Sequence, residues 1–281
     1  MNFNGRTAII TGAARGLGLS YARALAACGA QVVISDLGTD HQGGGADPGV
    51  VEAAVRTLRA EGARVVGHSA SLAEEAGCQA LVALALESFG GVDMLIHNAG
   101  WVGYQSLEQS DAGFIQSMLD INLYAPVWLC KQAWPHLKRS PAPRVLLTTS
   151  DRALYLCHAQ PGLLAYAAGK MAQVGLMNAL GKEGAEHGIL VNAVSPVAKT
   201  RMWGVTEAPQ ELKPEWVTPG VLFLLSELCH DSGYILRASN GQFSATRFEE
   251  NPGVDYPRDL ARIKAATVAE FAERWPSIKE H

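Results

Sequence analysis

Short apolar runs alternate with longer helical segments along almost the whole chain of 281 residues. Seven runs predict strands: Thr7–Ile10, Gln31–Ser35, Arg64–His68, Asp93–Ile96, Arg144–Thr149, Leu190–Val194 and Gly233–Leu236. Several are almost continuously apolar, as expected for parallel strands covered on both faces. The predicted helices are Gly16–Ala27, Val50–Glu61, Ala73–Phe89, Asp111–Lys138, Leu163–His187 and Pro214–Cys229. This alternation predicts a doubly wound α/β fold with right-handed crossovers.

The composition narrows the class of protein. Hydrophobic residues make up 48% and charged residues 18% of the chain, and the net charge is −4, so no nucleic-acid or membrane partner is expected. The five cysteines form no CxxC pair and the eight histidines form no HExxH motif. We therefore expect no disulfide framework and no metal site. No apolar run approaches the ~20 residues that cross a bilayer, and no signal peptide is apparent, which predicts a cytoplasmic protein.

We expect a single domain over residues 1–281, because no linker interrupts the chain. The Gly- and Asp-rich segment Gly38–Gly49 predicts a surface loop. Residues 240–281 form a C-terminal extension that we expect to pack on the domain or on a neighbouring subunit. Its tail, from Tyr256 on, carries four apolar residues at roughly helical spacing, which predicts a C-terminal helix: Leu260, Ile263, Ala266 and Phe271.

The sequence TGAARGLG, Thr11–Gly18, joins the first predicted strand to the first predicted helix. In that position Gly12 allows a tight turn, while Gly16 and Gly18 let the backbone approach a pyrophosphate and let the helix pack on the sheet. The N–H groups and dipole at the helix start favour an anion. The spacing TGxxxGxG differs from GxGxxG, so this turn alone is also compatible with an ordinary tight turn.

Asp36 follows the second predicted strand, about twenty residues after the turn, where an acidic residue binds ribose hydroxyls. Its charge would also repel the 2′-phosphate of NADP, by roughly 4 kcal/mol per unit charge at ~4 Å and an effective dielectric near 20. The sequence therefore favours NAD. NADP is the less favoured alternative, because the Arg15 guanidinium in the turn could bind a 2′-phosphate.

Tyr166 and Lys170 lie four residues apart, on one face of a predicted helix. A free tyrosine has a pKa near 10 and is a poor base at neutral pH. The lysine charge, together with a positive nicotinamide ring, would stabilise the phenolate. Tyr–Lys pairs are also common on helix surfaces, so the pair needs its sequence context.

That context resembles the short-chain dehydrogenase/reductase family over roughly residues 5–240. The motifs occur in order: TGxxxGxG, then HNAG at 97–100, DINLYAP around Asn122, Ser150 after the fifth strand, and YxxxK. The resemblance implies a Rossmann-type sheet of about seven strands in the order 3-2-1-4-5-6-7, with helices on both faces. It also implies a catalytic set in which Tyr166 is the acid/base, Lys170 lowers its pKa and holds the ribose, Ser150 holds the substrate oxygen and Asn122 anchors a water.

The cofactor-binding residues follow from the turn, from Asp36 and from the family motifs. The full predicted set is Gly12, Arg15, Gly16, Leu17, Gly18, Asp36, Asn98, Ala99, Gly100, Tyr166, Lys170, Pro196 and Thr200. Within this set the resemblance implies that Pro196 begins the segment that covers the nicotinamide and that Thr200 lies near its carboxamide.

Two positions depart from the family pattern. The catalytic serine usually lies thirteen residues before the tyrosine, where this chain has Ala153, whereas Ser150 lies sixteen before it. A three-residue insertion within Leu156–Ala165 explains the shift and keeps Ser150 in role. The alternative is that Ser150 only satisfies backbone groups at the strand end. Ala70 replaces an aspartate that often binds the adenine amine, and Ser71 could substitute for it.

Several segments are similar to the (3R)-hydroxyacyl-CoA dehydrogenase part of the peroxisomal multifunctional enzyme, among them DLGTDHQGGG, SPVAKTRM and NGQFSATRFEE. This predicts NAD-dependent conversion between a secondary alcohol and a ketone, with a bulky, largely apolar substrate that is hydroxyacyl-CoA-like or hydroxysteroid-like. Alternatives are a terpene or polyol dehydrogenase and a non-catalytic dinucleotide sensor. The candidate substrate residues, each of which could instead pack a loop, are Trp101, Tyr104, Tyr155, His158, Met202 and Trp203.

The segments Asp111–Lys138 and Leu163–His187 resemble the subunit interface of the family. A homodimer or homotetramer is therefore expected.

Overall fold

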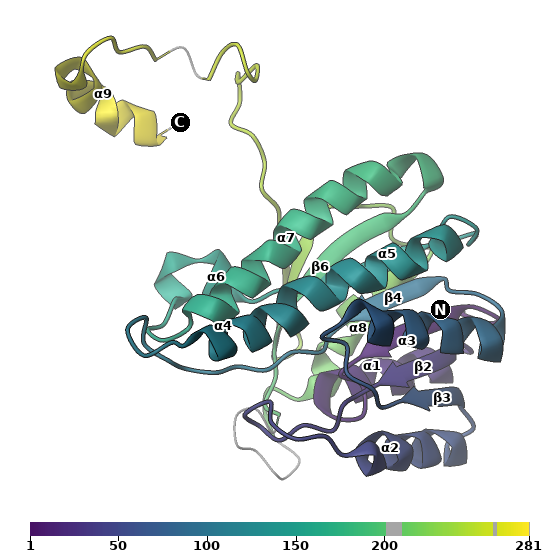
Figure 1. Ribbon diagram of the computed structural model, residues 1–281. Coiled ribbons are helices and arrows are strands. Elements are labelled where there is room, and N and C mark those ends of the chain that lie inside the picture. The colour runs from purple at the N-terminus through teal and green to yellow at the C-terminus, as the bar shows by residue number, and fades with distance from the viewer. Residues whose placement is uncertain (201–209, 261–262, 281) are drawn as a thin grey trace. The chain divides into compact units, whose positions relative to one another are not determined.

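Figure 1 shows a computed structural model of the chain, in which residues 1–200, 210–260 and 263–280 are described. The chain divides into two compact units, Met1–Thr246 and Arg247–His281. All predicted strands and the whole glycine-rich turn belong to the first unit.

The first unit is built on one sheet with the strand order β3-β2-β1-β4-β5-β6-β7-β8. Its strands are β1 (Thr7–Thr11), β2 (Gln31–Ser35), β3 (Arg64–His68), β4 (Met94–His97), β5 (Arg144–Thr148), β6 (Leu190–Val197), β7 (Ile235–Ser239) and β8 (Gln242–Thr246). Neighbouring strands are parallel except for β7 and β8. The order of the first seven strands confirms the predicted doubly wound sheet.

The antiparallel strand β8 was not predicted. It forms a hairpin with β7 through Asn240 and Gly241, whose φ angles are 52° and 74°. Positive φ at two central residues is typical of the tight Asn-Gly turn that joins antiparallel strands. The strand itself is mostly exposed, so no apolar run marks it. The Asn-Gly pair is the sequence signal that indicates it.

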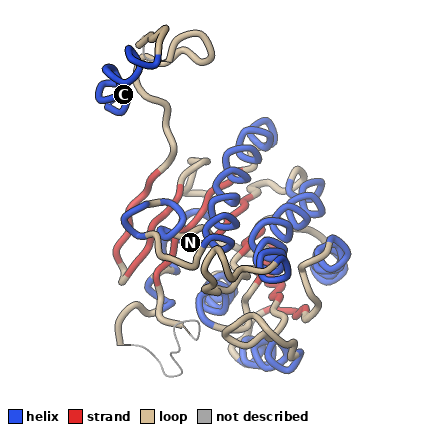
Figure 2. The backbone as a smooth tube through the Cα atoms, turned by 60° about the vertical axis from the view of Figure 1, so that its left-hand side comes forward, coloured by secondary structure: helices blue, strands red, loops and turns tan. Residues whose placement is uncertain are grey.

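Helices cover both faces of the sheet, as Figures 1 and 2 show. The helices of the first unit are α1 (Gly16–Ala27), α2 (Pro48–Ala60), α3 (Glu75–Phe89), α4 (Ala112–Leu119), α5 (Ala125–Leu137), α6 (Asp151–Leu154), α7 (Leu164–Gly184) and α8 (Thr218–Leu225). None of the described helices has the length and apolar character needed to cross a membrane.

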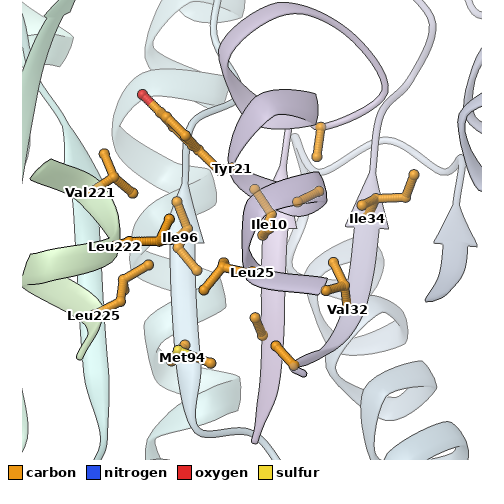
Figure 3. Packing of buried hydrophobic residues seen from close by; sticks show 14 of the residues in the cluster. Ile10, Tyr21, Leu25, Val32, Ile34, Met94, Ile96, Val221, Leu222 and Leu225 are labelled. Atoms are coloured by element: carbon orange, nitrogen blue, oxygen red, sulfur yellow. The ribbon is translucent and has the colours of Figure 1, made fainter. Parts of the chain in front are cut away.

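Among the described residues, a large hydrophobic core lies on each face of the sheet, and a third, smaller cluster contains Tyr166. Buried side chains of α1, α2 and α8 form the first, and those of α3, α5 and α7 form the second. Because successive strand residues point to opposite faces, Ile10 of β1 joins the first core and Ile9 the second. Figure 3 shows Ile10 in the first core with Tyr21 and Leu25 of α1 and Val221 of α8.

The single helix predicted over Asp111–Lys138 is interrupted. A π-helical turn, Asp120–Tyr124, separates α4 from α5. It turns Asn122 inward, where the side chain is fully buried and its amide donates to the Met118 carbonyl at 2.9 Å. Such π-turns insert one extra residue and often occur at functional sites. The apolar periodicity predicts a helix across this segment, but it does not indicate where the extra residue of a π-turn lies.

The C-terminal helix begins later than predicted. Helix α9 spans Val268–Glu280, so the first three residues of the predicted apolar pattern precede it: Leu260, Ile263 and Ala266. Its start is fixed by Thr267, whose hydroxyl accepts from the Glu270 N–H at 3.2 Å, while the Glu270 carboxylate accepts from the Ala266 N–H at 2.9 Å. This arrangement resembles a capping box, for which the T-x-x-E sequence is the signal. The packing of the extension 240–281 stays a prediction.

Candidate active site

The carboxyl ends of the parallel strands open into a cleft of about 1010 Å³, the place where doubly wound sheets bind ligands. One part, which we call the turn end, comprises the Gly12–Gly18 turn and Asp36. The other, the Tyr166 end, comprises Ser150, Tyr166 and Lys170. The predicted residues that line the cleft are Gly12, Arg15, Gly16, Leu17, Asp36, Asn98, Ala99, Gly100, Trp101, Ser150, His158, Tyr166, Lys170, Pro196 and Thr200.

The remaining predicted residues lie elsewhere. Gly18 is buried beneath the turn, and Asn122 is buried in the π-turn. Neither Tyr104 nor Tyr155 lines the cleft. Met202 and Trp203 lie outside the described residues. Among the residues that the structure describes, no group of three or more His, Cys, Asp or Glu side chains could hold a metal ion.

Two glycines of the turn are required by its geometry. Gly12 has φ +62°, and a Cβ atom on it would lie 2.8 Å from the Ala99 Cα. A Cβ atom on Gly18 would lie 2.3 Å from the Gly12 carbonyl oxygen, so this glycine lets α1 pack against the turn. Arg15 precedes α1 and has no side-chain acceptor that could cap the first N–H groups. Those N–H groups therefore suit a phosphate.

Asn98 holds the turn against the end of β4. Its amide donates to the carbonyls of Thr11 at 3.2 Å and of Gly12 at 2.9 Å. In return, the Thr11 hydroxyl accepts from the N–H groups of Asn98 at 3.1 Å and Ala99 at 3.0 Å. Both amide hydrogens of Asn98 are thus directed to the turn, and the predicted cofactor-binding residue acts at least in part by shaping it.

Asp36 and Arg15 face each other at the same end. The Asp36 carboxylate accepts from the N–H groups of Ala14 at 3.1 Å and Gly38 at 2.9 Å. The Arg15 Nη2 atom lies 3.7 Å from Asp36 Oδ1 and donates to the Thr39 carbonyl at 2.9 Å. The guanidinium that could have bound a 2′-phosphate is therefore already paired with a carboxylate.

The structure brings Ser150 and Tyr166 together. The Ser150 hydroxyl lies near the Tyr166 phenol and lowers the phenol pKa by favouring the phenolate, whereas burial of the ring raises the pKa more strongly. Ser150 also caps α6, since its hydroxyl accepts from the Arg152 N–H at 3.3 Å. Ala153 lies within α6. Ser150 thus lies near Tyr166, as a catalytic serine would, and also accepts from a backbone N–H, as a serine that only satisfies backbone groups would.

Lys170 lies one turn along α7 from Tyr166. Its ammonium group donates to the Thr148 carbonyl at 2.9 Å and lies 5.8 Å from the centre of the Tyr166 ring. Burial lowers the pKa of Lys170 to about 7. A negative phenolate or a bound ligand beside it would oppose this effect by favouring the charged ammonium.

Asn122 and His97 are buried next to the Tyr166 end of the cleft. The Asn122 Oδ1 atom is buried and has no hydrogen-bond partner among the described residues. It faces Gly100, on which a Cβ atom would lie 3.0 Å from Asn122 Oδ1 and 3.3 Å from Lys170 Nζ. His97 lies 2.9 Å from the Ile121 carbonyl and 3.1 Å from the Thr11 hydroxyl. Burial lowers the His97 pKa to about 3, so a neutral imidazole supports the π-turn.

The geometry of the site agrees with the similarity to known proteins. The sequence profile of short chain dehydrogenases matches residues 6–211. The chain belongs to the short-chain dehydrogenase/reductase family. It is 32% identical to a short-chain type dehydrogenase/reductase of Mycobacterium tuberculosis, over 98% of this chain and 94% of that protein.

The chain is also similar to a mouse enzyme and to a mycobacterial protein of known structure. Mouse peroxisomal multifunctional enzyme type 2 is 33% identical over 99% of this chain, which confirms the predicted resemblance. The chain covers only 37% of the mouse enzyme. The crystal structure of a short chain dehydrogenase from Mycobacterium avium matches with a TM-score of 0.84 at 26% identity, over all of this chain and 96% of that one.

Trp101 and His158 line the cleft, and each packs against a neighbouring aromatic ring. The Trp101 ring meets the Phe114 ring edge-on, with centroids 5.7 Å apart. A Cβ atom on Gly43 would lie 2.7 Å from Trp101, so Trp101 also packs against the loop after β2. The Tyr155 ring packs edge-on against His158, with centroids 6.0 Å apart, and below the Arg237 guanidinium at 4.7 Å.

An ion pair behind Ser150 was missed by the sequence analysis. The Asp151 carboxylate accepts from Arg237 Nε at 3.0 Å and Nη2 at 2.7 Å, and from the Ser195 hydroxyl at 2.8 Å. These bonds tie α6 to β6 and β7 and fix the backbone that follows Ser150. The partners lie 86 and 44 residues from Asp151, so no local pattern could have indicated the pairing.

Proposed function

We propose that the protein is an NAD-dependent dehydrogenase that interconverts a secondary alcohol and a ketone. The observation that carries the proposal is that Ser150 and Tyr166 line one end of the cleft with Lys170, whose ammonium lies 5.8 Å from the centre of the Tyr166 ring, while a turn suited to a phosphate forms the other end. A sensor without catalysis has no need for a buried tyrosine next to a buried lysine and a serine.

The turn end fits the dinucleotide. The N–H groups at the start of α1 would bind the pyrophosphate, and Asp36 would bind the adenosine ribose hydroxyls. Lys170 would hold the other ribose, and Thr200, whose side chain lies near Gly16, would contact the nicotinamide. When bound, NAD supplies the hydride acceptor. The carboxylate of Asp36, at roughly 4 kcal/mol per like charge at ~4 Å, disfavours a 2′-phosphate.

The Tyr166 end fits proton transfer. In oxidation, the Tyr166 phenolate takes the proton of the substrate hydroxyl, while the Ser150 hydroxyl holds the substrate oxygen. The carbinol carbon loses its hydrogen as hydride, which leaves the ketone. The Lys170 charge stabilises the phenolate, and Asn122 Oδ1 accepts from a water that returns the proton to solvent. In reduction each step is reversed.

We further propose a bulky, largely apolar substrate, either hydroxyacyl-CoA-like or hydroxysteroid-like. The cleft volume of about 1010 Å³ is at the upper limit for small-molecule sites, as suits a cofactor and a large substrate bound together. Trp101 and Val102 supply an apolar wall. We also propose that the protein is a homodimer or homotetramer and that it is located in the cytoplasm.

The test is NADH formation from NAD, with NADP in parallel, over (3R)- and (3S)-hydroxyacyl-CoAs, hydroxysteroids and simple secondary alcohols. We expect turnover of one class with NAD, and a loss of about 10³-fold in kcat/KM for Tyr166→Phe, since general acid–base catalysis contributes 10²–10⁴-fold. Equal turnover by Tyr166→Phe would contradict the proposed mechanism. Binding of NAD without turnover of any class would favour a sensor.

A further inference from the structure

Arg152 places a guanidinium in the wall of the cleft, two residues after Ser150. Its Nη1 atom donates to the Tyr104 hydroxyl at 2.5 Å. The Tyr104 hydroxyl in turn donates to the Gln160 side chain at 3.1 Å, and Gln160 also lines the cleft. The Tyr104 hydroxyl therefore donates its hydrogen to Gln160, and its oxygen accepts from Arg152 and holds that side chain in place.

The charge of Arg152 is not balanced by a neighbouring carboxylate. The adjacent acid, Asp151, is already bound by both Arg237 and Ser195. Over residues 1–200, 210–260 and 263–280, no Asp or Glu oxygen forms an ion pair with Arg152, whereas Arg15 at the turn end is paired with Asp36. No Arg152 nitrogen is buried without a partner, so its remaining N–H groups stay accessible.

This guanidinium lies close to the reacting groups. Its charge acts on the Tyr166 phenol and lowers the phenol pKa, and the Arg152 backbone N–H donates to the Ser150 hydroxyl at 3.3 Å. A planar guanidinium with free N–H groups matches two carboxylate oxygens better than it matches a neutral carbonyl.

We propose that Arg152, held by Tyr104, binds a carboxylate of the substrate, so that the preferred substrates are hydroxy and oxo carboxylic acids with an apolar body. The carboxylate contacts Arg152 while the carbinol reaches Ser150 and Tyr166. This assignment rests on the proposed interconversion of alcohol and ketone and changes its substrate class, because it selects free hydroxy acids over esters, over thioesters such as hydroxyacyl-CoAs and over uncharged alcohols such as hydroxysteroids.

Binding gives the first test, because it does not depend on turnover. Octanoate and octanamide are titrated into the enzyme–NADH complex, with wild type compared to Arg152→Met, Arg152→Lys and the exposed control Arg56→Met. We expect octanoate to bind wild type about 10- to 100-fold more tightly than octanamide, as for a charge-assisted hydrogen bond. Arg152→Met should abolish this preference, Arg152→Lys should retain part of it, and Arg56→Met should retain all of it.

Turnover gives the second test, with racemic 2- and 3-hydroxyoctanoate, their methyl esters and their CoA thioesters. We expect Arg152→Met to raise KM for the acids about 10- to 100-fold and to change KM for the esters less than threefold. An equal loss on acids and esters, or a preference of wild type for octanamide or for the thioesters, would overturn the assignment. If no alcohol is oxidised but octanoate still binds through Arg152, the proposed function fails while the anion site stands.

Discussion

At the turn end of the cleft, Arg15 and Asp36 lie 3.7 Å apart and the carboxylate accepts two backbone N–H groups. At the Tyr166 end, Lys170 is buried beside a carbonyl and Arg152 has only a phenol as its side-chain partner among the described residues. At the turn end, the charges of Arg15 and Asp36 offset each other before any ligand binds. At the Tyr166 end, the positive charges of Lys170 and Arg152 lie near a phenol, and a phenolate or an anionic ligand would offset them.

The two ends also differ in how the chain builds them. The turn end comes from β1, α1 and β2, which are consecutive in the sequence. The Tyr166 end needs the ends of β4 and β5, the π-turn, α6 and α7. A comparison of substitutions at the two ends should therefore separate cofactor effects from effects on the reaction.

After Tyr166→Phe, the largest effect is expected for Ser150. Ser150→Ala removes the hydroxyl near Tyr166 that we propose holds the substrate oxygen, so kcat/KM should fall about 10²- to 10³-fold, as for loss of one donor to a developing charge. The affinity for NAD should be unchanged. Steady-state kinetics and NAD titration measure the two quantities.

The matched variant is Ala153→Ser, which restores a serine at the usual spacing. Because Ala153 lies inside α6, a serine there should not rescue Ser150→Ala. Rescue by the double variant would mean that the spacing, and not the strand end, defines the catalytic serine.

At the turn end, Asp36→Asn should change cofactor preference without changing the reaction. Removing the negative charge should raise kcat/KM for NADP relative to NAD by about 10²-fold, since the like-charge repulsion at ~4 Å is roughly 4 kcal/mol before screening. The paired Arg15 is then free to bind the 2′-phosphate. An unchanged NADP/NAD ratio would show that Asp36 does not face the 2′ position.

A third comparison concerns stability, between a glycine in the tightly packed turn and a glycine with open space around it. Gly12→Ala should lower the free energy of unfolding by about 2–4 kcal/mol, because it combines a positive φ with a Cβ 2.8 Å from Ala99. Gly62→Ala is the control, since Gly62 has φ +90° but no atom within 4 Å of its Cβ position. It should cost about 1 kcal/mol. Urea denaturation compares them, and equal losses would mean that close packing of the turn adds nothing.

These differences between the two ends explain which features could be predicted from the sequence alone. Local patterns predict the strands β1–β7 and the turn end, through apolar runs, glycines at one turn and an acid at one strand end. The order of the strands in the sheet came from the resemblance to the family. The inward position of Asn122 depends on a π-turn, and the Asp151–Arg237 pair joins residues 86 apart. Tertiary structure decides both. Tyr166 and Lys170 lie between these cases, because four-residue spacing places them on one helix face but says nothing of their burial.

The smallest effect concerns the pH dependence of stability at the Tyr166 end. Lys170 titrates near 10.5 when unfolded, and burial lowers its pKa to about 7 in the folded protein. Between these values the unfolded chain binds more protons, so the free energy of unfolding should rise with pH, by at most about 1.4 kcal/mol per unit. Buried Cys78 and Cys130, whose pKa values are raised, oppose the rise above about pH 9.

Urea denaturation of the cofactor-free protein between about pH 7 and 8.5 measures this slope. Lys170→Met should remove it, whereas Lys182→Met, an exposed lysine on the same helix, should leave it intact. A slope that persists in Lys170→Met would place its origin elsewhere. NAD should flatten the slope in wild type, because the ribose hydroxyl that Lys170 would hold accepts from the charged ammonium and so favours it.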